Sequence, residues 1–469
     1  EALKVLEKAA MDKGCKFVLA KQAEKVKYKL DKNSFEIDKE KYQITLNGTW
    51  QPENAAIAIG IINELNEKVE KITGDESIRV DRKGRVINED GAPSDTNYNS
   101  GKSNKNTGER FQKLTLLDKQ YPHKEHISST DGLTLEYLCR RFRSFASRIA
   151  GNPLYYSIQD IRRFVTSLGT SKILILQGMS GTGKTSLPVA WGKFTNVQTT
   201  VIPVQPMWKE RSDLIGYYNE FTGKFNESMI LEKLYEANKS DKIFLIVLDE
   251  MNIARVEYYF AEFLSLLELP TAEERILEVT NSISKKDPKE LHKGKLILPD
   301  NVWFIGTANN DDSTFAISDK VYDRSMVLNL DYRCDPFIGE DDYDPITISD
   351  ETFKSLLKQA QKEYALTKRG RARIKDIDKY IQATFSITFG NRIRRQIEKY
   401  VPIYIACGGT EVEALDDILS KKVLRKLESQ NPVYVKSKSE ELISKFNEIF
   451  GQDNMPNSEA YIRKLANNS

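Results

Sequence analysis

From Ile173 to Trp191 the chain reads ILILQGMSGTGKTSLPVAW. The apolar run at its start, Ile173–Leu176, is typical of a buried parallel strand, and a helix is expected after the glycines. Between them, Gly178–Thr185 fits the pattern G-x-x-x-x-G-K-[ST] in a strand–loop–helix context. Glycines at this spacing let the backbone curl and turn successive N–H groups toward a phosphate near a helix N-terminus. The stretch therefore predicts a nucleotide-binding loop.

Two side chains of this loop have expected chemical roles. Lys184 would neutralise the β- and γ-phosphates during catalysis, and the Thr185 hydroxyl would hold Mg²⁺. The expected nucleotide-binding residues of the loop are Gly178, Met179, Ser180, Gly181, Thr182, Gly183, Lys184, Thr185 and Ser186.

Strands and helices alternate around this loop. Helices are expected at Leu135–Ile149 and from Ser157, as N-cap, to Gly169. Further strands are expected at Thr199–Pro206, Lys242–Glu250, Asn301–Asn310 and Ser325–Leu330. This alternation predicts a parallel α/β sheet, in which ligands bind at the carboxyl ends of the strands. From about Ile346 the pattern is helical throughout, so we expect a nucleotide-binding core at residues 131–335 and a helical lid with further helices at residues 336–469.

Two adjacent carboxylates end the strand KIFLIVLDE. After a phosphate-binding loop, Asp249 is expected to bind Mg²⁺ through water, and Glu250 to polarise the water that attacks the γ-phosphate. The alternative is a pair of acids that stabilise a helix N-terminus. Asn309, at the end of GTANN, is expected to orient the attacking water, with Asn310 as the alternative; either could instead be a strand-ending turn residue.

Two arginines are candidates for contact with the γ-phosphate. Arg324, in DKVYDRS, lies too far along the sheet to reach its own nucleotide, so it is expected to serve the nucleotide of a neighbouring subunit as a finger. The alternative is a salt bridge to Asp319 or Asp323. Arg392, at the start of a lid helix, is expected to sense the γ-phosphate, although Arg394 and Arg395 compete for that role.

The chain before the core has a different character. Residues 1–75 are expected to form a small α+β region, with helices at Leu3–Ala10 and Ala56–Leu65 and a strand or hairpin within Ser34–Trp50. Residues 76–130 are expected to be mostly flexible linker, because Gly84–Gly108 consists largely of Gly, Ser, Asn, Asp and Lys.

Composition excludes several classes of protein. The 469 residues carry 70 Lys and Arg against 68 Asp and Glu, so the global charge does not indicate a polyanionic partner. Three histidines and four scattered cysteines argue against a zinc site, a Ser-His-Asp hydrolase or a disulfide framework. No transmembrane or signal-peptide pattern is found, so we expect a cytoplasmic protein without a membrane partner. The sequence starts at Glu1 rather than Met, so residues are expected upstream.

The order of these motifs resembles the AAA+ ATPase superfamily: phosphate-binding loop, LDEMN, GTAN, an Asp-Arg pair and a helical lid. Longer runs are similar to its McrB-like branch, which is related to MoxR-type and dynein-related domains. These runs are DLIGYYNEFTGKF, LDEMNIARVEYYFAEFLSLLE, LPDNVWFIGTAN, FGNRIRRQIEKY and ILSKKVLRKLE. The resemblance covers about residues 150–430.

This resemblance implies a homo-oligomeric ring, usually a hexamer, with ATP and Mg²⁺ at each subunit junction. It also implies insertions at Trp208–Glu227 and Leu269–Leu298, the second a Lys-rich hairpin that could follow a DNA backbone. The alternative for the second insertion is a solvated loop without a DNA contact. The expected function is an ATPase motor of a DNA restriction or anti-phage defence system whose nuclease is a partner protein. The alternatives are a MoxR-like chaperone that remodels proteins, a nucleotide-gated assembly scaffold and a GTP-specific McrB-type enzyme.

Overall fold

The computed structural model describes residues 109–309, 314–331 and 334–467, together with the backbone of five short strands before them. The chain divides into two compact units, residues 1–105 and 106–469. Among the helices described, none is long and apolar enough to cross a membrane.

The first unit contains two small antiparallel sheets. One has the order β1 (Glu24–Tyr28), β2 (Asn33–Ile37), β3 (Glu40–Ile44), and the other pairs β4 (Arg79–Val80) with β5 (Val86–Ile87). The hairpin expected within Ser34–Trp50 is thus present as β2 and β3. The two helices expected in residues 1–75, and the linker from Gly84 to Gly108 apart from β5, lie outside the described residues.

The second unit begins with a helix that the sequence does not predict. Helix α3 (Gln112–Gln120) lies inside the expected linker of residues 76–130. The segment is ordered because Phe111, Leu114 and Leu117 are buried against the core. The Glu227 carboxylate accepts hydrogen bonds from the first backbone N–H groups of this helix, at 2.9 Å each.

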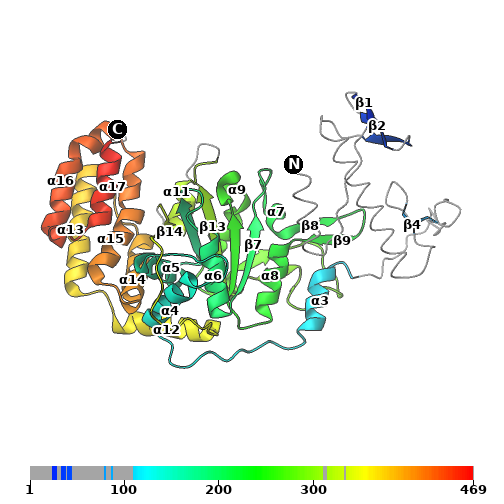
Figure 1. Ribbon diagram of the computed structural model, residues 1–469, viewed down its shortest axis with the longest axis horizontal. Coiled ribbons are helices and arrows are strands. Elements are labelled where there is room, and N and C mark those ends of the chain that lie inside the picture. Colours follow the sequence, from blue (N-terminus) through cyan, green and yellow to red (C-terminus); the bar gives the residue numbers. More distant parts are fainter. Residues whose placement is uncertain are drawn as a thin grey trace. The chain divides into compact units, whose positions relative to one another are not determined.

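A five-stranded parallel sheet forms the centre of this unit (Figure 1). Its order is β14 (Met326–Asn329), β6 (Ile173–Gly178), β13 (Val302–Asn309), β10 (Phe244–Asp249) and β7 (Gln198–Pro203). All five expected strands are present, and candidate residues lie at the carboxyl ends of three of them, β6, β10 and β13. The predicted architecture is confirmed: a parallel α/β sheet with helices on both faces, followed by a helical region.

Alternate side chains of each strand enter two separate cores, because successive residues of a strand point to opposite faces. Leu174 and Leu176 of β6 pack with α4 (Leu135–Ser147), α5 (Ile158–Thr170) and α6 (Ser186–Thr195). Ile173 and Ile175 pack on the other face. The helices of that face are α7 (Arg211–Ile215), α8 (Met229–Asn238), α9 (Val256–Tyr259), α10 (Ala261–Leu266) and α11 (Asp319–Arg324). Ser157 caps α5 as expected, and the helix continues one residue past Gly169.

Two hairpins extend from the core where insertions are expected. The first pairs β8 (Gly216–Asn219) with β9 (Lys224–Glu227), and the second pairs β11 (Ile276–Glu278) with β12 (Lys295–Ile297).

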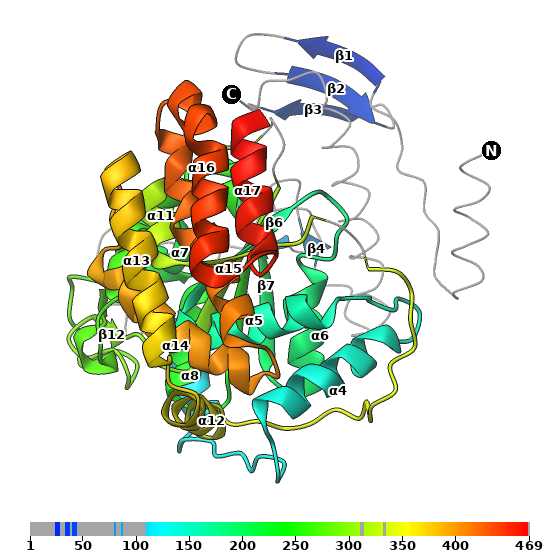
Figure 2. The same cartoon turned by 90° about the vertical axis from the view of Figure 1, so that its left-hand side faces the viewer.

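Helices alone make up the regular structure described after Asp350. They are α12 (Asp350–Glu363), α13 (Lys368–Phe385), α14 (Asn391–Ala406), α15 (Glu411–Lys422), α16 (Pro432–Phe450) and α17 (Pro456–Asn467). Figure 2 shows α16 and α17 side by side, in the colours of the chain's end. Helix α14 packs against α5, so the helical region shares a continuous core with one face of the sheet.

Candidate active site

The loop between β6 and α6 has the backbone conformation that its glycines predict. Gly178, Gly181 and Gly183 have φ values of 143°, 77° and 89°, a backbone conformation that residues other than glycine rarely adopt. A Cβ atom on Gly178 would also lie 2.3 Å from the backbone oxygen of Leu330. Glycine is therefore required here both by conformation and by space.

Lys184 lies inside the curl of this loop. Its side chain is buried, and its Nζ donates hydrogen bonds to the backbone oxygens of Gly178 at 3.0 Å and Met179 at 2.6 Å. Met179, Ser180 and Gly181 are exposed at the outer side of the loop. The ammonium group is thus held where a phosphate bound by the loop would need a counter-charge.

Tyr156, which lies just before the N-cap of α5, contacts the phosphate-binding loop. Its hydroxyl donates a hydrogen bond of 3.0 Å to the backbone oxygen of Gly183. A Cβ atom on Gly183 would lie 2.9 Å from the Tyr156 hydroxyl oxygen. Burial raises the pKa of Tyr156, which keeps the phenol protonated as a donor. No sequence motif marks this residue, and sequence reasoning missed it.

One carboxylate oxygen of Asp249 accepts hydrogen bonds from two hydroxyls, those of Thr185 and Thr307. The hydroxyls of Thr185 and Thr307 donate to Oδ1 of Asp249 at 2.6 and 2.7 Å, and the backbone N–H of Glu250 donates to the Thr307 hydroxyl at 2.9 Å. The start of α6 and the ends of β10 and β13 are thereby joined into one cluster. Sequence reasoning missed Thr307, although it is the only hydroxyl in the otherwise apolar run VWFIGTA and so carries a detectable signal.

Glu250 and Asn309 stand beside this cluster. Glu250 is exposed and has a left-handed backbone with φ 52°, which turns the chain out of β10 immediately after Asp249. Asn309 pairs in register with Gly178, so the end of β13 adjoins the start of the phosphate-binding loop. The backbone oxygen of Asn309 accepts a hydrogen bond of 3.0 Å from the Asn252 side chain. Asn310 lies outside the described residues.

The oxygen atoms of this cluster are suitable ligands for Mg²⁺. This cation prefers oxygen ligands and is commonly held in nucleotide sites by one or two protein groups, substrate phosphates and water. The Thr185 hydroxyl and the Asp249 carboxylate supply two such oxygens at hydrogen-bonding distance from each other. Lys184, close by in sequence, provides the positive charge that a triphosphate also needs.

The loop and the strand-end residues fall within one family match. Residues 173–325 match the AAA domain family, dynein-related subfamily. This stretch of the chain is similar to AAA domains, which bind nucleotides through a P-loop. The match spans the loop, Asp249, Glu250, Asn309 and Arg324, so the candidate residues of the core lie inside the matched region.

The other similarities to known proteins do not indicate a function. Residues 345–469, which hold the helical region and Arg392, match a domain of unknown function (DUF8727). One match among solved structures is an ATPase candidate from Cytophaga hutchinsonii, with 13% identity and a TM-score of 0.43 over 71% of this chain and 96% of the other. At this distance the likeness carries no conclusion about activity. No protein of curated function matches the chain.

A second polar cluster lies at the opposite end of the sheet of the AAA domain. Arg324 ends α11 before β14, and its backbone oxygen accepts a hydrogen bond of 3.2 Å from Ser171, before β6. The phosphate-binding loop follows the other end of β6. Six residues of strand separate the two ends, which is roughly 20 Å at about 3.3 Å per residue. Arg324 is therefore remote from the nucleotide site of its own chain.

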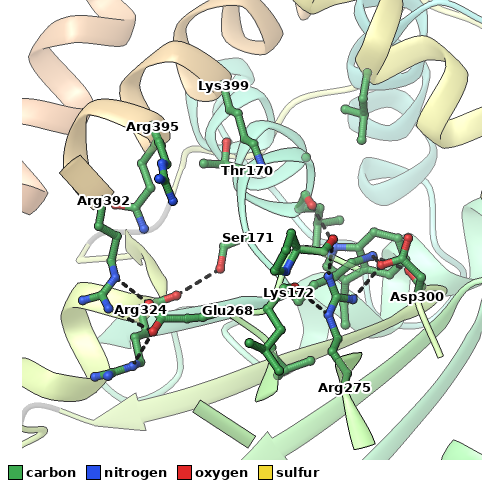
Figure 3. A pocket seen from close by; sticks show the side chains of 18 of the residues that line it. Thr170, Ser171, Lys172, Glu268, Arg275, Asp300, Arg324, Arg392, Arg395 and Lys399 are labelled. Atoms are coloured by element: carbon green, nitrogen blue, oxygen red, sulfur yellow. Dashed lines mark hydrogen bonds and ion pairs between the residues drawn. The ribbon is translucent and has the colours of Figure 1, made fainter. Parts of the chain in front are cut away.

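Arg392 lies with Arg324 rather than with the phosphate-binding loop (Figure 3). Its Nε and Nη2 contact the two carboxylate oxygens of Glu268 at 2.5 and 2.9 Å, and Nε of Arg324 contacts the same carboxylate at 3.0 Å. The start of α14 is placed there because α14 packs along α5 and reaches the amino ends of the strands. Arg324 is paired with Glu268, and not with Asp319 or Asp323, which were the expected alternatives.

A cavity of about 750 Å³ separates the core from α14 at this end, and most of its charged side chains are basic. These side chains are Lys172, Arg275, Arg324, Lys354, Arg392, Arg395 and Lys399, against Glu268 and Asp300. Burial lowers the pKa of Lys172 to about 7, although Asp300 opposes the shift. Burial would raise the pKa of Asp300, but Lys172, Lys354 and Arg275 bring it to about 2. The cavity is thus suited to anions.

Proposed function

We propose that the chain is a Mg²⁺-dependent ATPase that acts as a ring-forming motor. The observation that carries this proposal is the cluster of Thr185, Asp249 and Thr307 beside the loop that holds Lys184. Its geometry brings the two expected Mg²⁺ ligands together although they lie on different elements. Bound Mg²⁺ would neutralise charge that develops on the phosphates.

The other residues have roles that follow from their positions. Lys184 would exchange its hydrogen bonds with the loop oxygens for bonds to the β- and γ-phosphates. Glu250 would accept a hydrogen bond from the attacking water and draw its proton away from the γ-phosphate. Asn309, beside the loop, would orient that water through its amide.

Completion of the site requires a second copy of the chain. Arg324 and Arg392 lie at the end of the sheet that faces away from their own loop, so they would contact the γ-phosphate of a nucleotide bound by a neighbour. Such a head-to-tail contact generates a closed ring when the rotation between subunits closes, and a hexamer is the expected size. The active site would then lie at each junction.

We further propose that the ring is the McrB-like motor of a DNA restriction or defence system, with the nuclease in a partner protein. Support comes from the exposed lysines between β11 and β12, including Lys285, Lys289 and Lys293, which can follow a phosphate backbone. ATP is the proposed nucleotide, and GTP is the alternative.

One observation favours a second candidate, a MoxR-like remodeller of proteins. The β8–β9 hairpin exposes Tyr217, Tyr218 and Phe221, and Phe221 at its tip is fully exposed. Exposed aromatic side chains on a projecting hairpin can grip a polypeptide by apolar contact.

Steady-state hydrolysis of ATP and of GTP, each with and without double-stranded DNA, tests these proposals. The motor proposal predicts ATP hydrolysis that DNA stimulates, with a stimulation that weakens steeply as salt rises. Hydrolysis that DNA leaves unchanged would favour the protein remodeller. A preference for GTP would indicate a GTP-specific enzyme, and an absence of hydrolysis of either nucleotide would contradict the ATPase proposal itself.

A further inference from the structure

Glu268 is the only carboxylate that the described residues place against both candidate trans-acting arginines. It follows α10, and its two oxygens receive Nε and Nη2 of Arg392 as a two-point contact while one of them also receives Nε of Arg324. Two-point contacts of this kind fix the plane of a guanidinium group, which a single contact does not. Arg324 gains a second anchor from its own helix, since Nη1 donates to the backbone oxygen of Lys320 at 3.0 Å.

The contacts with Glu268 leave the outer nitrogens of both arginines available. Among the described residues, neither Nη2 of Arg324 nor Nη1 of Arg392 has a hydrogen-bond partner. Two guanidinium groups this close would repel each other without a shared anion between them. Glu268 therefore compensates the pair and still leaves a net positive charge and free donors, which is what an incoming phosphate requires.

Glu268 also joins two parts of the chain that belong to different layers. Arg324 ends α11 in the AAA domain, whereas Arg392 begins α14 in the helical region. Along the same face of α14, Arg395 and Lys399 line the cavity but have no ion pair with a described residue. The carboxylate thus selects one arginine of α14 and ties it to the core.

We propose that Glu268 is a positioning residue that holds Arg324 and Arg392 as one unit for the γ-phosphate bound by a neighbouring copy. The inference rests on the proposed trans-acting ATPase. Glu268 does not contact the phosphate; it sets the spacing and orientation of the two groups that do. Because it bridges core and helical region, a shift of α14 would displace both arginines together.

The test compares Glu268→Gln with a matched control, Glu262→Gln. Glu262 lies on the preceding helix α10, pairs with Arg211 at 3.1 Å and has the same side-chain exposure of 30% as Glu268, but it lies outside the cavity. Each variant is assayed for kcat and KM of ATP hydrolysis and for thermal unfolding. Partly exposed ion pairs contribute little to stability, so both variants are expected to unfold within about 3 °C of the wild type.

The proposal predicts that Glu268→Gln lowers kcat at least tenfold with KM within threefold, whereas Glu262→Gln changes kcat less than twofold. Glu268→Asp keeps the charge on a shorter side chain, and should recover a part of the lost kcat. If Glu268→Gln fails to fold, Glu268→Asp must itself show an intermediate kcat at unchanged KM.

Several outcomes would overturn the proposal. An unchanged kcat in Glu268→Gln would mean that the arginines need no shared anion. A raised kcat would mean that the carboxylate competes with the phosphate for the two arginines and so inhibits hydrolysis, instead of positioning them. These outcomes presuppose a hydrolysing wild type; a wild type that does not hydrolyse ATP would instead contradict the proposed function.

Discussion

Glu250 adopts a left-handed backbone that costs free energy for any residue other than glycine, on the order of 1 kcal/mol. The conformation is maintained because the Glu250 N–H is held by Thr307, whose hydroxyl is in turn bound to Asp249. The same hydrogen bonds that join the proposed Mg²⁺ ligands therefore also orient the proposed base. The Glu250 side chain is exposed at the end of β10.

Glu250→Gln keeps the size of the side chain but removes its ability to accept a proton. Hydrolysis of ATP is expected to fall at least a hundredfold, since general bases contribute about 10²- to 10⁴-fold. Nucleotide affinity, measured by titration calorimetry, should change less than threefold, because Lys184 and the loop remain intact. A variant that hydrolyses ATP at the wild-type rate would remove Glu250 from the mechanism.

Tyr156→Phe tests the support of the loop from behind. Loss of one hydrogen bond to the Gly183 backbone is worth about 1 kcal/mol, so nucleotide affinity should fall about fivefold. Tyr155→Phe is the matched control, since the Tyr155 hydroxyl has no hydrogen bond with a described residue. Equal affinities for the two variants would show that the Tyr156 contact does not shape the loop.

At the scale of elements, the sequence predicted what local pattern determines. Most of the strands contain apolar runs, and a parallel sheet brings the carboxyl ends of its strands together, so the sequence predicted that the loop with Thr185 and the carboxylate of Asp249 lie at the same edge. Helix α3 was not predicted, because its burial depends on a distant surface that the linker composition does not report. Glu268 could not be found either, since its role exists only where α10, α11 and α14 converge.

Burial of Lys172 beside β6 makes stability depend on pH. Its pKa is about 7 in the folded chain and near 10.4 when unfolded, so the unfolded chain binds more protons between these values. Stability should therefore rise with pH in this range, by at most about 1.4 kcal/mol per pH unit from this group. Lys172→Met removes that contribution, while the buried Lys422, with a pKa also near 7, remains as a common background.

Denaturant unfolding at pH 7, 8 and 9 measures this effect. The difference in unfolding free energy, wild type minus Lys172→Met, should increase with pH. A difference that stays constant would show that Lys172 titrates normally.

The hairpin β11–β12 carries the proposed contact with DNA. Lys285→Glu with Lys293→Glu should abolish stimulation by DNA and leave basal hydrolysis within twofold, since both side chains are exposed and remote in sequence from the loop. The slope of the logarithm of the DNA-binding constant against the logarithm of salt concentration should become shallower, by the amount expected for about two lost phosphate contacts. Lys358→Glu with Lys362→Glu, on the exposed face of α12, is the control. Equal DNA stimulation in both double variants would exclude the hairpin.

At the scale of the whole molecule, one chain holds the two halves of the proposed active site at opposite ends of one sheet. In this proposal the end with the loop binds the nucleotide, and the end with Arg324, Arg392 and Glu268 completes the site of a neighbour. Such an arrangement would couple hydrolysis to assembly, because Arg324 and Arg392 lie far from the loop of their own chain.

Mixing two inactive variants tests this division most directly. Arg324→Ala retains Glu250, and Glu250→Gln retains Arg324, so each alone should bind ATP but hydrolyse it poorly. In a random equal mixture, one of the four kinds of junction carries both intact residues, and ATP hydrolysis should recover to about a quarter of the wild-type rate. A mixture no more active than the average of its two components would contradict the account, because the arginine would then not act on a neighbouring copy.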